Sequence, residues 1–201
     1  MNDFSFIKNE KIQKQIKFAI TIDEMKNIFR RNLIADGSRR ENDAEHSWHL
    51  AMLAMLLEEY SAEKVNVERV LKIALVHDLI EVYAGDTFAY DAKGNEDKHA
   101  REVQAADKLF GMLDPVQGAE IRALWDEFEA METAESRYAN AIDRIQPLIL
   151  NYLTDGHTWK MGVTSAQIYK RMDIIRTATP ELWHIVEGII NTSIEAGILN
   201  P

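Results

Sequence analysis

Four residues of this chain have the types and the spacing of a divalent-metal site: His46, His77, Asp78 and Asp143. His77 and Asp78 are neighbours in the mostly apolar stretch ALVHDLIEVYAGD, and neighbours on a helix point about 100° apart. Both can therefore reach one point only over the groove between them. An isolated His-Asp pair is more often a core histidine beside a locally paired carboxylate. The presence of His46, and of Asp143 where an unpaired carboxylate would be costly, favours a metal ion.

This ligand set determines the chemistry. The chain has no cysteine, so imidazole and carboxylate are the available ligands, and they suit Mn2+, Co2+, Fe2+, Ni2+ or Zn2+, with Mg2+ also accepted. A bound divalent ion lowers the pKa of water from about 16 toward about 7 and polarises a phosphoryl oxygen. Glu81, one turn after His77, can face the same cavity as a general acid or base. Its alternative is an ordinary exposed ion pair.

The overall charge restricts the substrate. A net charge of −10 gives no general attraction to nucleic-acid polymers or to anionic membranes, so a phosphate ester must meet locally placed cations. Arg31 and Arg39 precede His46 and are the candidates for that contact. Lys98 and Glu102 are spaced as a solvated ion pair. His49 is interpreted as packing or as support for a ligand.

The elements that must position these residues are helical. The apolar residues repeat with a helical period almost throughout, which predicts an all-α, single-domain helical bundle over residues 1–201, with the motifs between about 23 and 155. The expected helices are one from about Lys8, one capped by Thr21 and Glu24 that runs through Arg31, and others that begin near Asn42, Asn66, Asp97, Asp114, Thr133, Thr164 and Thr179. Gly85 is expected to end the helix that carries His77. The segments LIADGSRREN and TFAYDAKGNED are expected to be loops.

The motifs RRENDAEHSW, ALVHDLIEVYAGD and AIDRIQP together resemble the HD-domain phosphohydrolases, in the branch of bacterial 5'-deoxynucleotidases and their eukaryotic HD-domain relatives. The resemblance implies a metal site in the core of the bundle, where His46, His77, Asp78 and Asp143 bind one divalent ion. It also implies that Glu81 positions or deprotonates the attacking water, and that Asp86 lies near the sugar and helps to exclude a 2'-hydroxyl.

The same resemblance includes one mismatch. The nucleotidase pattern has an Arg-Trp pair fifteen and fourteen positions before the first metal histidine, and these positions are Arg31 and Asn32 here. Because an amide cannot replace the stacking area of an indole, we expect weak discrimination among bases.

The predicted function is a divalent-metal-dependent phosphohydrolase that releases phosphate from (deoxy)nucleoside 5'-monophosphates. The alternatives are hydrolysis of another phosphorylated metabolite, including a diphosphate ester, or a non-catalytic, metal-stabilised sensor or scaffold. The sequence lacks a signal-peptide pattern, so we expect a cytoplasmic protein. Its acidic amphipathic helices are compatible with a homodimer.

Overall fold

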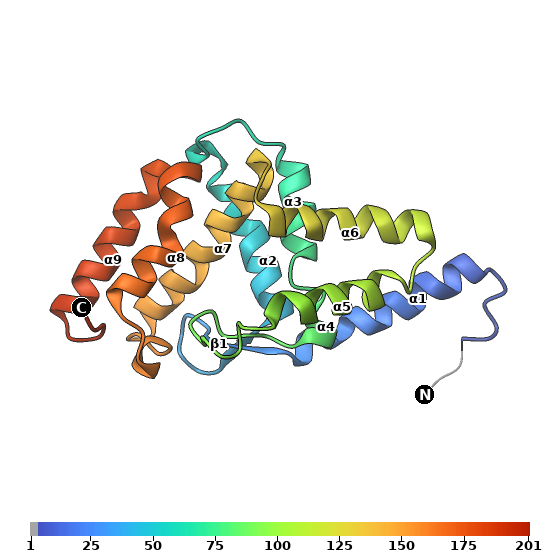
Figure 1. Cartoon of the computed structure of the whole chain (residues 1–201), viewed down its shortest axis with the longest axis horizontal. Helices are drawn as coiled ribbons and strands as arrows, with labels where there is room; N and C mark the ends of the chain where they lie inside the picture. Colours follow the sequence, from blue (N-terminus) through green and yellow to red (C-terminus); the bar gives the residue numbers. More distant parts are fainter. Residues whose placement is uncertain (1–3) are drawn as a thin grey trace.

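The structure, a computed structural model, describes residues 4–201, and most of them are helical (Figure 1). The helices are α1 Glu10–Ile22, α2 Asp43–Leu56, α3 Val67–Val76, α4 Glu81–Ala84, α5 Lys98–Phe110, α6 Pro115–Ala130, α7 Ala134–Leu153, α8 Ser165–Ala178 and α9 Trp183–Glu195. Short 3-10 turns lie at Asp23–Asn27, Glu58–Tyr60, Trp159–Met161 and Pro180–Leu182. The expectation of a helical bundle is confirmed, apart from a small pair of strands.

Helix α7 forms the centre of the bundle. It packs against α2, α3 and α6 on one side and against α8 and α9 on the other (Figure 1). Ala139, Ile142 and Ile145 of α7 are almost wholly buried, and they join α2 and α3 in the larger hydrophobic core. A second apolar cluster joins α5 and α6 to α1 and the end of α3. Functional side chains on the middle of α7 are therefore held by packing from several directions.

The predicted helix that runs through Arg31 is wrong. Helix α1 continues to Ile22, where the Thr21 hydroxyl donates to the Lys17 carbonyl within the helix instead of capping a new one. A 3-10 turn follows, and then strand β1, Phe29–Leu33, pairs antiparallel with β2, Arg40–Asn42. The pair is too short to show sustained alternation in the sequence, and part of the segment LIADGSRREN is strand instead of loop. This hairpin places β1 against α7.

The predicted helix from Asn66 to Gly85 is interrupted. Asn66 caps α3 by accepting from the Arg69 N–H, as expected, but α3 ends at Val76. Turns follow at 77–80, and the short α4 ends at Gly85, whose φ of 74° suits glycine. The break lets His77, Asp78 and Glu81 leave the strict helical spacing. They can approach the site from more than one side.

Most other helix starts agree with the sequence, but α9 begins at Trp183, after a 3-10 turn, instead of directly after Thr179. Asn42 and Glu45 form a capping box on α2, and Thr133 with Ser136 forms one on α7. Asp114 caps α6 ahead of Pro115, and Thr164 caps α8. No helix among residues 4–201 has the length and apolar character needed to cross a membrane.

Candidate metal centre and substrate cavity

Four side-chain atoms converge between α2, the end of α3 and α7. His46 Nε2 lies 3.0 Å from Asp143 Oδ1 and 3.7 Å from Asp78 Oδ2. His77 Nε2 lies 3.0 Å from Asp78 Oδ2 and 3.7 Å from Asp143 Oδ1. Ligand atoms of His46, His77 and Asp143 all lie within 4.8 Å of one another. The structure thus brings together the four residues that the sequence predicts as metal ligands.

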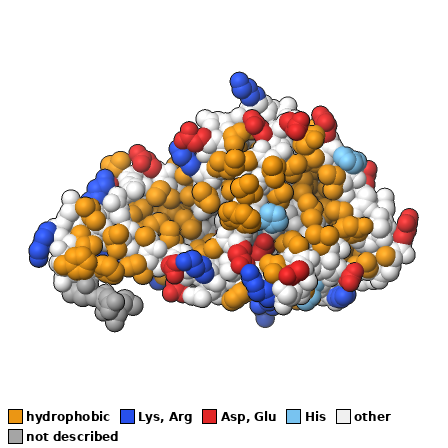
Figure 2. Space-filling view, turned by 180° about the vertical axis from the view of Figure 1, so that it is seen from behind, with side chains coloured by type: hydrophobic (Ala, Val, Ile, Leu, Met, Phe, Trp, Pro, Cys, Tyr) orange, Lys and Arg blue, Asp and Glu red, His pale blue; other side chains and the backbone are white. Residues whose placement is uncertain are grey.

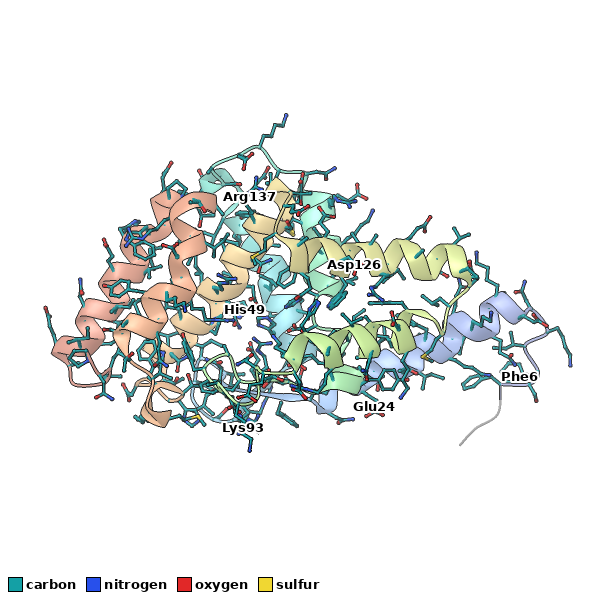
Figure 3. All side chains as sticks on the ribbon, in the orientation of Figure 1. Phe6, Glu24, His49, Lys93, Asp126 and Arg137 are labelled. Atoms are coloured by element: carbon teal, nitrogen blue, oxygen red, sulfur yellow. The ribbon has the colours of Figure 1, made fainter. Side chains whose placement is uncertain are left out.

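Hydrogen bonds from the Nδ1 atoms fix the orientation of the two imidazole rings. His77 Nδ1 donates to the Ala74 carbonyl at 2.8 Å, and His46 Nδ1 donates to Gln146 Oε1 at 3.2 Å. Both rings therefore present Nε2 to the site, as outer partners of metal-binding histidines usually arrange. Gln146 in turn donates to Glu41 at 2.6 Å and to His49 Nδ1 at 3.1 Å. His49, labelled in Figure 3, stands behind the site as a supporting residue.

Charge at this point fits a cation. Burial lowers the pKa of His77, but the carboxylates of Asp78 and Asp143 outweigh burial and raise it to about 10. The pKa of His46 is lowered by burial and then by Arg30. His77 Nε2 is buried and makes no well-aligned hydrogen bond among the described residues, although Asp78 Oδ2 lies 3.0 Å away. Two carboxylates facing an imidazole nitrogen without such a hydrogen bond suit a divalent ion.

A second group of carboxylates lies beside this set. Asp43, Glu81 and Asp86 bring their ligand atoms within 4.8 Å of one another. Glu81 is buried, which excludes the alternative of an ordinary exposed ion pair. Burial and the charges of Asp78 and Asp43 raise the pKa of Glu81, and burial raises that of Asp43 to about 7. Both oxygens of Asp43 and Oε2 of Glu81 are buried without a hydrogen-bond partner among the described residues, so the ionised forms of these two carboxyl groups are costly side by side.

Arg30 is the cation nearest the metal ligands, and the sequence interpretation missed it. Its Nη1 donates to Asp78 Oδ2 at 2.8 Å, and Asp43 Oδ1 lies 3.9 Å away. Side chains of a strand point alternately to its two faces, so a predicted strand here would have placed Arg30 and Asn32 on the same face. The expected helix concealed this pattern.

The two predicted phosphate-binding arginines lie in different places. Arg31 is exposed but lines the cavity beside the metal set. Arg39 is exposed, and its guanidinium pairs with both oxygens of Glu45, at 2.8 and 2.6 Å. The structure does not place Arg39 among the cavity residues, because the loop between β1 and β2 directs it toward the first turn of α2.

A cavity of about 240 Å³ opens from the metal set. Lys98 and Glu102 form the expected i,i+4 pair, 3.4 Å apart, but the pair is not simply solvated, because both residues line this cavity and Glu102 is buried. Asn32 also lines it, but is buried, and its amide donates to the Pro147 carbonyl at 3.3 Å. The aromatic side chains in the wall are Phe88, Tyr90, Phe128 and Trp159.

Comparison with known proteins agrees with this geometry. The model of the HD domain family matches residues 22–183. A predicted metal-dependent phosphohydrolase from Magnetospirillum magnetotacticum MS-1 superposes with a TM-score of 0.91 at 45% identity, over 97% of this chain and 98% of that one. A conserved hypothetical protein from Pyrococcus furiosus, at 22% identity and a TM-score of 0.64, shares the fold over 87% of this chain and 98% of its own.

Two relatives carry names that state an activity. The 5'-deoxynucleotidase HDDC2 of Danio rerio is 29% identical over 69% of this chain and 68% of its own length. The 5'-deoxynucleotidase hdd1 of Schizosaccharomyces pombe is 34% identical over 53% of this chain and 54% of its own. The matched segments leave a third to a half of each relative outside the comparison. With the match of the family model and the convergence of both histidines and both aspartates, the chain belongs to the HD domain family.

Proposed function

We propose that this protein is a divalent-metal-dependent phosphohydrolase that releases phosphate from deoxynucleoside 5'-monophosphates. The observation that carries the proposal is the convergence of His46, His77, Asp78 and Asp143 beside a cavity whose wall also contains arginines without a carboxylate partner within 4.0 Å among residues 4–201. The names of the relatives support a nucleotide as the substrate. A divalent ion held by the four ligands would supply an acidified water and a polarised phosphoryl oxygen.

The residues around the ligands have complementary roles. Arg30 fixes the Asp78 carboxylate, so its charge is already compensated, whereas Arg31 is available to the substrate phosphate. The charge of a divalent ion bound by the four ligands would favour the ionised form of Glu81. The Glu81 carboxylate then accepts the proton of the attacking water. Asp43, whose carboxylate lies beside that of Glu81, raises the pKa of Glu81 and so strengthens it as a base. Asp86, at the cavity wall, lies near the sugar and disfavours a 2'-hydroxyl.

The test is phosphate release from the four common deoxynucleoside 5'-monophosphates and their ribose counterparts. Metal-free protein is reconstituted separately with Mn2+, Co2+, Fe2+, Ni2+, Zn2+ and Mg2+. We expect hydrolysis with at least one ion and a higher kcat/KM for the deoxy compounds. Stoichiometric metal binding without hydrolysis of any nucleotide would contradict the proposal and favour a sensor or scaffold.

We also propose that the protein forms a homodimer through the exposed face of α2. Trp48, Met52, Met55 and Leu56 follow the spacing of one helical face, and Trp48 and Leu56 are 63% and 66% exposed. Figure 2 shows hydrophobic side chains gathered across the middle of the rear face. Monomeric proteins seldom expose a large apolar patch.

Light scattering after size exclusion tests the dimer. We expect a dimeric mass for the natural protein and a monomeric mass for Trp48→Glu combined with Leu56→Glu. Lys170→Glu, at an exposed position of α8, is the charge-changing control. A monomeric natural protein at micromolar concentration would refute the dimer and leave the enzymatic proposal intact.

A further inference from the structure

Two arginines outside the metal set also line the cavity. Arg144 of α7 and Arg171 of α8 both line it, and Arg144 Nη1 donates to the main-chain carbonyl of Arg171 at 2.8 Å. Asp143, one position earlier, faces His46 and His77. Because successive helical residues point about 100° apart, Arg144 leaves α7 toward α8 instead of toward the metal ligands.

These guanidinium groups have no anionic partner in the described part of the chain. Within residues 4–201, no carboxylate lies within 4.0 Å of either group, and the Arg171 side chain makes no hydrogen bond. Most other arginines of this acidic protein differ, although Arg31 and Arg40 also have no carboxylate within 4.0 Å among residues 4–201. Carboxylate partners within that distance are present for Arg30, Arg39, Arg69, Arg101, Arg122, Arg137 and Arg176.

Tyr90 completes the group from the loop after α4. Burial raises the pKa of the Tyr90 hydroxyl, and the charges of Arg171 and Arg144 oppose that rise, so the phenol lies within the field of both guanidinium groups. Its ring packs edge-on against Phe88, with centroids 5.4 Å apart, and it lines the same cavity. Arg144, Arg171 and Tyr90 therefore line one cavity from separate elements, and no carboxylate among residues 4–201 pairs with any of them.

We propose that Arg144, Arg171 and Tyr90 form a second anion subsite, which receives an additional phosphate on the nucleotide substrate. Two neighbouring guanidinium groups repel each other, and a phosphate accepting charge-assisted hydrogen bonds from both relieves that repulsion. A neutral base offers acceptors but no compensating charge. The inference rests on the proposed function: the phosphate at the metal set is hydrolysed to inorganic phosphate, and the one at the arginine pair stays on the product.

Binding without turnover provides the first test. Calorimetry on EDTA-treated protein compares dAMP with three nucleotides that carry a second phosphate: deoxyadenosine 3',5'-bisphosphate, adenosine 2',5'-bisphosphate and dADP. We expect at least one of the three to bind about tenfold or more tightly than dAMP, as two charge-assisted hydrogen bonds would provide. Equal affinity for dAMP and all three would overturn the subsite.

A variant then assigns the effect to the residues. Arg171→Gln keeps the main-chain carbonyl that Arg144 uses, and it should bring the affinity ratio between the preferred compound and dAMP close to one. Arg176→Gln is the matched control on the same helix, because Arg176 pairs with Asp173 and stacks on Trp183 outside the cavity. An unchanged ratio in Arg171→Gln would overturn the assignment.

The outcomes distinguish this subsite from the proposed activity. Selective binding that depends on Arg171, in a protein that releases no phosphate when reconstituted with metal, would retain the subsite and refute the phosphohydrolase. Phosphate release from monophosphates without selective binding would retain the enzyme and refute the subsite. Selective binding with a correspondingly lower KM for the doubly phosphorylated compound supports both.

Discussion

The two sides of the cavity are built differently. On the metal side, His46 and His77 are buried, come from α2 and the end of α3, and have their outer nitrogens fixed by hydrogen bonds. On the opposite side, Tyr90 and Arg171 are partly exposed, and the Arg171 side chain has no hydrogen-bond or ion-pair partner among residues 4–201. A metal site needs ligands held in one geometry before the ion arrives, whereas a recognition surface keeps donors free for the substrate. The comparison predicts that changes on the metal side affect chemistry and those on the other side affect affinity.

The largest effect is expected from the ligands themselves. His77→Ala or Asp78→Ala should lose bound metal and activity together, with metal affinity falling by more than the 10- to 100-fold typical of outer partners. Thermal stability in the presence of metal should fall as well, because binding supports the folded state. Elemental analysis, phosphate release and thermal unfolding measure the three effects. Stoichiometric metal in both variants would exclude these residues as ligands.

Glu81 separates proton transfer from metal binding. Glu81→Gln should retain the ion and change KM little, while kcat falls about 100-fold or more. The matched control is Glu102→Gln, which alters a buried carboxyl group in the same cavity on α5. Steady-state kinetics decide the result, and unchanged turnover at saturating substrate would remove Glu81 from the mechanism.

Gln146 tests the orienting hydrogen bonds. Gln146→Ala removes the acceptor of His46 Nδ1, so metal affinity should fall by about 10- to 100-fold with the ligand set intact. The measurement is competition with a metal chelator. Gln117→Ala, which affects a hydrogen bond to Gln15 on α1, should leave the affinity unchanged. Equal affinities in both variants would show that packing alone orients His46.

On the substrate side, Phe88 is a candidate stacking surface in place of the absent tryptophan. Phe88→Ala should raise KM for a deoxynucleotide by about tenfold with a smaller change in kcat, since stacking contributes about 1 to 3 kcal/mol per base and acts before the chemical step. Phe6→Ala is the control, because Phe6 is 71% exposed and does not line the cavity. A larger change in kcat than in KM would contradict this role.

The smallest effect is a change in the pH dependence of stability. Burial raises the pKa of Glu41 to about 7 from an ordinary value of 4.5, despite Arg30 and Gln146. Between these values the unfolded chain has the ionised carboxylate while the folded chain keeps the proton, so stability falls as pH rises through this window. Glu41→Gln should reduce that fall in metal-free protein, as urea unfolding at about pH 5 and about pH 7 would measure. An unchanged fall would assign it to other carboxyl groups.

The accuracy of the sequence predictions follows the range of the interactions involved. Caps at Asn42, Asn66, Asp114 and Thr133 depend on residues three or four positions apart, and they were predictable. The β1–β2 hairpin was not, because strand pairing depends on residues about ten positions apart and on packing against α7. The break after Val76 was likewise hidden within a continuous helical pattern.

For the site, the sequence by itself determined the metal chemistry, since the residue types at His46, His77, Asp78 and Asp143 limit the ligands to imidazole and carboxylate. Only the tertiary structure decided which cations are near the substrate. Arg39 forms an ion pair with Glu45, and Arg30 forms one with Asp78. Arg31, Arg144 and Arg171 line the cavity without a carboxylate partner within 4.0 Å in residues 4–201. The physical reason is that the role of a charged side chain depends on its nearest opposite charge, which the fold selects: Glu45 is six positions from Arg39, whereas Asp78 is 48 positions from Arg30.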